Sequence, residues 1–182
     1  MADTRYFVDI MSEIVAAVRA EYDTTSVPSP VFPVYIHDHP VKVANRLVER
    51  DHNKTLKFQK YPLITLFEDF IQKDGGFEHA YLVDCTILIL DYSEKTRNSD
   101  ERYEQVIKPI LHPIYELLLQ SIEDSKYIET NGVESIDKDM YIRPAWGEEG
   151  KYGNVGLIFN DNTDGIQINL RDLKVVSYNN CT

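Results

Sequence analysis

The sequence has no segment long and apolar enough to span a membrane as a helix, which needs ~20 such residues. Residues 1–18 contain Asp9 and Glu13 and no basic stretch, so they do not resemble a secretory signal. Cysteine is scarce: Cys85 lies in an apolar run and Cys181 is next to last, which fits neither a disulfide framework nor a zinc site. We expect a soluble protein of a reducing compartment, without a membrane partner and with Cys85 buried.

Positive charge is also in short supply. The 182 residues include 19 lysines and arginines against 30 acidic residues, for a formal charge of -11. This balance argues against a protein that grips nucleic acid phosphates over a wide surface, because such binding needs clustered basic side chains. It fits either plain solubility or the acidic wall of a channel through which DNA passes without being bound.

Sequence motifs for catalysis are missing as well. There is no G-x-S-x-G elbow, and neither cysteine stands beside an activating group. The segment GEEGKYGN (147–154) lacks the ending of a P-loop, and its Glu148 and Glu149 would repel phosphate. The sequence therefore predicts a protein that is not an enzyme, with no catalytic residues and no cofactor.

One histidine pair is a candidate for metal binding. If YIHDHP continues as a strand, His37 and His39 point to the same side and could share an ion. Two ligands do not complete a site, and the other histidines have no diagnostic spacing. We expect no metal, and a metal-dependent enzyme that uses His37 and His39 is the first alternative.

NDNTDG has a partial calcium-loop pattern. Asn160, Asn162 and Asp164 occupy its first, third and fifth positions, with Gly165 at the sixth. The twelfth position, where a bidentate glutamate is needed, is Arg171. Asn, Asp and Gly also favour tight turns, so a turn is the better interpretation.

Helical spacing marks two regions. The first is an amphipathic helix at about 4–21, with Thr4 as its N-cap. The second begins at a capping box, Asn98 with Glu101, and keeps its apolar spacing to Ile122. Pro109 and Pro113 interrupt it, so the sequence predicts a kinked helix or two helices joined near Lys108.

Strand signals fill most of the remainder. Residues 79–92 have one continuous apolar face and form the clearest strand, and the phase change after Leu170 indicates a bulge near Arg171–Asp172. Pro33 places its segment at a sheet edge or a strand start. Besides a short helix at 41–50 and a turn at DGG (74–76), the other expected strands are 31–36, 140–146, 156–159 and 165–170.

YPLITLFEDF (61–70) fits two periods. In helical steps its apolar residues form a stripe that Phe70 and Ile71 prolong; in steps of two, Tyr61, Leu63 and further residues share one face. Pro62 fits a strand start, and the acidic end leads into the DGG turn, so we interpret it as a strand to about Phe67 that pairs with the next one.

These elements predict a single α+β domain over 1–182, with loop-rich insertions at 40–60 and 124–164. Its mainly antiparallel sheet is packed by the N-terminal amphipathic helix and the long proline-kinked helix.

At KYPLITLFEDF the sequence resembles the tail-terminator and neck proteins of tailed bacteriophages, in which an aromatic-Pro strand closes in a short acidic segment. Family members begin with an amphipathic helix and a V-P-V-Y-like strand, the places held here by SEIVAAVRAEY and VFPVYIHDHP. The succession extends over residues 4–123. YPLITLFEDF, KPILHPIYE and YGNVGLIFND are most similar to neck proteins of crAss-like phages and their relatives. Residues 40–60 and the 124–164 insertion are departures from a compact terminator.

The resemblance implies a terminator-like fold and a virion structural protein, assembled in the bacterial host cytoplasm. It implies a homo-oligomeric ring of about six or twelve copies between portal and tail, through which double-stranded DNA passes without specific binding. Neighbouring portal, neck or tail proteins are the expected partners, and no catalytic residues carry over. Candidate ring-interface or lumen-loop residues are Glu68, Asp69, Asp74, Glu148 and Glu149. The second alternative is an adaptor that binds partner proteins through its acidic surface.

Overall fold

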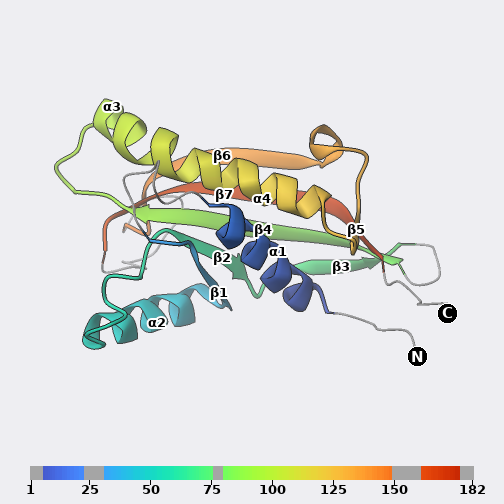
Figure 1. The fold of residues 1–182 in the computed structure, drawn as a ribbon, viewed down its shortest axis with the longest axis horizontal. Coiled ribbons are helices and arrows are strands. Elements are labelled where there is room, and N and C mark those ends of the chain that lie inside the picture. The colour runs from blue at the N-terminus through green and yellow to red at the C-terminus, as the bar shows by residue number, and fades with distance from the viewer. Residues whose placement is uncertain (1–5, 23–30, 76–79, 149–160, 177–182) are drawn as a thin grey trace.

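The computed structural model describes residues 6–22, 31–75, 80–148 and 161–176. Its architecture is the predicted α+β class: a curled, mostly antiparallel seven-stranded sheet packed by helices (Figure 1). In chain order the elements are α1 (Phe7–Glu21), β1 (Val34–Asp38), α2 (Pro40–His52), β2 (Leu63–Phe67), β3 (Ile71–Asp74), β4 (Ala80–Tyr92), α3 (Ser99–Arg102), the π-helical segment η1 (Tyr103–Leu111), α4 (His112–Glu123), β5 (Ile128–Glu129), the 3-10 turn η2 (Val133–Ser135), β6 (Lys138–Trp146) and β7 (Thr163–Val176).

Two long antiparallel strands, β4 and β7, form the centre of the sheet. At one end of this pair the sheet continues through β2 and the parallel β1 on the β4 side, and through β6 on the β7 side. At the other end, β3 pairs antiparallel with β4, and β5 pairs antiparallel with β7. Asp84 of β4 faces both Arg171 and Asp172, and Asp172 has a φ of 47°. The predicted bulge is thus confirmed.

The stretch 61–70 contains a strand at 63–67, and the helical alternative is wrong. Leu63–Phe67 forms β2, which pairs antiparallel with β4 as expected, after a cis Tyr61–Pro62 peptide. The chain leaves the ladder at 68–70 and pairs with β4 again as β3, a strand that the sequence pattern did not predict.

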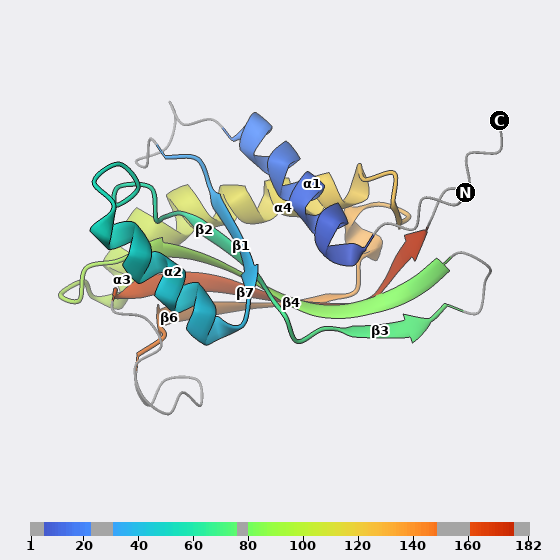
Figure 2. The ribbon, with the colours of Figure 1, turned by 90° about the horizontal axis from the view of Figure 1, so that it is seen from below.

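One face of the sheet is covered by α1 and by the helical run that ends in α4 (Figure 2). The predicted apolar stripe of α1 is fully buried there: Phe7, Ile10, Met11, Ile14, Val15 and Val18. The helix begins after Tyr6, so the predicted cap was misplaced, and Thr4 itself lies outside the described residues. Ile64 and Leu66 of β2 also point into this main core.

The opposite face is covered by α2 around β1 and β2. Val43 and Leu47 pack there on Leu63 and on Trp146 of β6, in a second apolar cluster. Residues 40–60, expected to be a loop-rich insertion with a short helix, thus include a helix of 13 residues. The second expected insertion contains β5 and β6 within its described part. Pro33 precedes an edge strand, as predicted.

The helical run 99–123 stays continuous through both prolines. Asn98 and Glu101 form the predicted reciprocal capping box. Pro109 cannot donate a backbone hydrogen bond and would clash with the preceding turn of an α-helix. Around Pro109 the helix is instead the wider π-helical segment η1, in which the His112 N–H donates to the carbonyl of Ile107. The interruption lies where the sequence predicted it, and its form is a change of hydrogen-bond pattern.

Other differences concern the end of the chain. β7 begins at Thr163, so Asp164 and Gly165 are strand residues and the predicted turn does not include them. The expected strand at 156–159 and Cys181 lie outside the described residues, whereas Cys85 is buried as predicted. Within the described ranges, no helix has the length and apolar character needed to cross a membrane.

Candidate functional site

The five candidate interface or lumen residues do not converge on one surface. Glu68 follows β2 and forms a salt bridge with Lys42 of α2 (3.4 Å), and Asp69 is exposed beside it. Asp74 ends β3 and pairs with Tyr81, near the start of β4. Glu148 follows β6, at the far end of the sheet. About eleven strand residues, or ~35 Å, separate those two ends. Glu149 lies outside the described residues.

The histidines of YIHDHP do not share a side of one strand. β1 ends at Asp38, so His39 becomes the N-cap of α2 and its Nδ1 accepts the Val41 N–H (3.2 Å). The His37 ring bonds the Leu66 carbonyl through Nδ1 (2.9 Å). Within the described ranges, no group of three or more His, Cys, Asp or Glu side chains is placed to hold a metal ion. The expectation of one shared side is therefore wrong.

Asp164, a candidate calcium ligand in the sequence, is instead the acceptor of a buried ion pair. Its Oδ1 accepts hydrogen bonds from the Arg102 guanidinium of α3 and from the Ala145 N–H (2.9 Å), and the residue is fully buried. The Asn162 side-chain nitrogen donates to the Ser93 carbonyl (2.8 Å), whereas its Oδ1 has no hydrogen-bond partner among the described residues. Asn160 lies outside the described residues. The Asp164 contacts connect α3, β6 and β7, and residues 163–165 belong to strand β7 and not to a calcium-binding loop.

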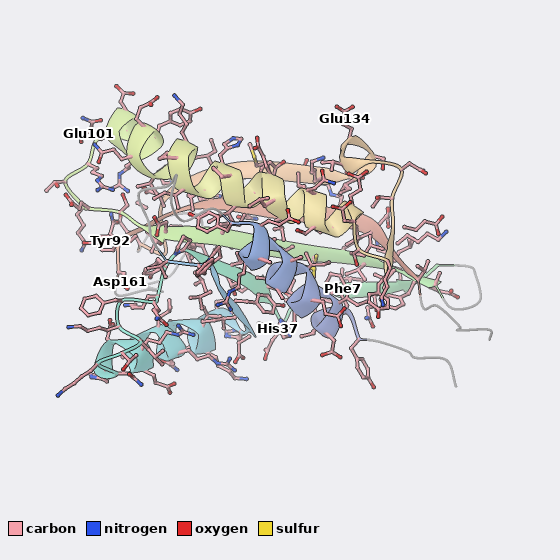
Figure 3. All side chains as sticks on the ribbon, in the orientation of Figure 1. Phe7, His37, Tyr92, Glu101, Glu134 and Asp161 are labelled. Carbon is pink, nitrogen blue, oxygen red and sulfur yellow. The ribbon has the colours of Figure 1, made fainter. Side chains whose placement is uncertain are left out.

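A second buried carboxyl, Asp91 of β4, is the cross-strand neighbour of Asp164 on β7. Desolvation, reinforced by the Asp164 charge, raises the pKa of Asp91 to about 7, although the Tyr92 N–H and Arg97 oppose the shift. Figure 3 shows this end of the sheet near the labelled Tyr92 and Asp161. This pair could not be predicted from the sequence, because it depends on the register of β4 against β7.

The exposed side of α2 is basic. Residues 40–60 contain six lysines and arginines and two acidic residues, although the whole chain is strongly acidic. Lys42, Arg46 and Arg50 recur at intervals of four along α2, and we call these three residues the basic surface. Asp38 pairs with Lys42 (3.3 Å) and Arg46 (2.7 Å). Burial opposes its charged form, but the His39 N–H and these two cations outweigh it and lower the pKa of Asp38.

The opposite side of the molecule is acidic. Residues 94–137 contain ten acidic and five basic residues. We call the exposed side chains of Asp100, Glu101, Glu104 and Glu134, on α3, η1 and η2, the acidic surface. Figure 3 shows Glu101 and Glu134 on the side of the sheet away from α2. One chain thus presents opposite charges in opposite directions.

Between α1, β1 and the end of α2 lies an open pocket of about 490 Å³. Arg19 of α1 and Arg50 of the basic surface line it, together with apolar residues that include Phe32, Val34 and Leu56. Burial, followed by the nearby charge of Arg19, lowers the pKa of Arg50. Arg50 donates to the Gln59 carbonyl (2.7 Å). Neither arginine pairs with a carboxylate among the residues that the structure describes.

No protein-family model matches this sequence, and no curated protein is significantly similar to it.

The described part of the chain therefore offers charged surfaces and an arginine-lined pocket, which are suited to binding a partner of opposite charge. Its buried polar groups are used mainly to join elements of the fold.

Proposed function

We propose that this chain is a virion structural protein of a tailed bacteriophage and forms a homo-oligomeric ring around the DNA channel of the neck or tail. The ring joins head to tail or terminates the tail, beside portal, neck or tail proteins. Double-stranded DNA passes through it without specific binding. Assembly takes place in the cytoplasm of the bacterial host, and the chain acts without catalysis or a cofactor.

The observation that carries the proposal is the position of the basic and acidic surfaces on opposite sides of one chain. Rings are built from heterologous contacts, in which one surface of a copy binds a different surface of the next. Opposite charges on those two surfaces favour the head-to-tail orientation and disfavour contacts between like surfaces. A two-fold dimer through either surface would instead bring like charges together.

The fold supports the proposal in a second way. The resemblance to neck and terminator proteins rests on an aromatic-Pro strand at 61–70, and Leu63–Phe67 is a strand. It also rests on an amphipathic first helix, a long strand and a long helix in that order, which α1, β4 and the run from α3 to α4 supply.

Light scattering and electron micrographs of the purified chain test this proposal. We expect a single species whose mass is a multiple of 21.1 kDa, seen as rings, that dissociates as salt screens the charged contact. A monomer or two-fold dimer at every concentration, from a chain that is also missing from virions, would contradict it. In that case an adaptor that binds partner proteins through the acidic surface is the better explanation.

A further inference from the structure

Within the described ranges, no carboxylate is recorded as an ion-pair partner of either arginine in the pocket between α1, β1 and α2. Arg50 is half-buried, and the only partner recorded for its guanidinium in the described residues is the Gln59 carbonyl. Arg19 and Arg50 line the same pocket, where like charges repel, and burial followed by the Arg19 charge lowers the pKa of Arg50. The other cations of α2 differ, since Lys42 and Arg46 are paired with Asp38. An anion between Arg19 and Arg50 would remove this repulsion.

We propose that this pocket receives a carboxylate side chain from the acidic surface of a second copy of the chain, and that this contact closes the ring. The inference rests on the proposed function and identifies its subunit contact. An arginine pair can hold a carboxylate through several charge-assisted hydrogen bonds. The apolar lining, Phe32, Val34 and Leu56, lowers the local dielectric and strengthens those bonds.

The acidic surface has carboxylates free for this role. Asp100 and Glu134 are exposed, and no hydrogen bond or ion pair to either side chain is recorded in the described ranges. By contrast, Glu101 completes the capping box and Glu104 pairs with Lys108 (3.2 Å). Because the two surfaces lie on opposite sides of the sheet, each copy can donate a carboxylate to one neighbour and accept one from the other.

Sedimentation velocity over a range of concentrations tests the proposal, with circular dichroism to check that each variant is folded. Arg19→Gln with Arg50→Gln removes the pocket charges, and we expect subunit affinity to fall by about 30-fold or more. Lys54→Gln with Lys57→Gln is the matched control: it also removes two positive charges, but neither lysine lines the pocket. The protein concentration at which this control assembles into rings should lie within about threefold of the wild-type value.

A mixing experiment tests which surfaces meet. Arg19→Gln with Arg50→Gln removes the positive charges of the pocket, and Asp100→Asn with Glu134→Gln removes the free carboxylates of the acidic surface. Each variant alone should remain monomeric. Mixed in equal amounts they should form a one-to-one dimer that cannot grow, because one intact pocket meets one intact acidic surface.

The opposing outcomes separate this inference from the proposed function. If the Arg19→Gln, Arg50→Gln variant forms rings as readily as the wild type, the inference is overturned, but the proposed ring function is not. A wild-type chain that stays monomeric at all concentrations would overturn the inference, and its presence in virions would then decide the proposed function. Binding of a DNA duplex at ~0.1 M salt, lost in the same variant, would assign the pocket to phosphate and also overturn the inference.

Discussion

Replacing Arg102 by Met should destabilise the chain severely. Arg102 and Asp164 form a buried ion pair between α3 and β7, and Asp164 is fully inaccessible. Without the guanidinium, the Asp164 carboxylate would keep only the Ala145 N–H as a partner among the described residues, because its Oδ2 already has none there. The carbonyls of Arg97 and Glu94, which also accept from Arg102, would lose their donor.

The expected cost is large because the charge left behind cannot reach water. Removing one partner of a buried ion pair typically lowers the free energy of unfolding by ~3–5 kcal/mol. The double variant Arg102→Met with Asp164→Asn should recover part of this loss, since a neutral amide is less costly to bury than an unpaired carboxylate. We expect a coupling free energy of about 1–3 kcal/mol between the two positions.

Urea denaturation of the wild type, both single variants and the double variant gives this cycle. All must be compared at one protein concentration, because assembly adds to the apparent stability. Lys108→Met is the control on the same helical run: its exposed pair with Glu104 should contribute less than ~0.5 kcal/mol. A loss below ~1 kcal/mol in Arg102→Met, or a double variant no more stable than the single one, would refute this reasoning.

Three further predictions concern the core and the cap. Because the folded pKa of Asp91 is raised to about 7, above its ordinary value of 3.8, the native state keeps a proton that the unfolded chain has released between those values. The free energy of unfolding should therefore fall as pH rises from about 4 to 7, by at most ~1.4 kcal/mol per unit, and Asp91→Asn should flatten this slope in urea titrations. Gly165→Ala should cost ~1–3 kcal/mol by thermal unfolding, because the new Cβ would lie 2.6 Å from Leu90 Cδ2; wild-type stability would show that the Leu90 side chain can move aside. Asn98→Ala should cost ~1 kcal/mol and lower the melting temperature, and no change would mean that the capping box contributes little.

The stretch 61–70, which fits both a helical and a strand period, shows what the hydrophobic pattern of the sequence can and cannot predict. Leu63 and Thr65 face the cluster under α2, whereas Ile64 and Leu66 face the main core, and all four are fully buried. A strand buried on both sides has apolar residues at every position, so alternation alone cannot distinguish it from a helix. The strand-start proline decided the question correctly.

Contacts between segments that are distant in the sequence could not be predicted from its hydrophobic pattern. Arg102 and Asp164 are 62 residues apart, and their pairing depends on the register of β7 as well as the path of η1. The same is true of Arg19 and Arg50, which line one pocket because α1 and α2 both pack against β1. The basic character of residues 40–60 was readable in the sequence, but its position opposite the acidic surface required the fold.

The most direct test of the proposed virion role is to search purified particles of tailed phages that carry this gene for the chain, by antibody labelling and mass spectrometry. We expect a fixed number of copies per particle, with label confined to the neck or tail. Virions that contain the portal and tail proteins but none of this chain would contradict it.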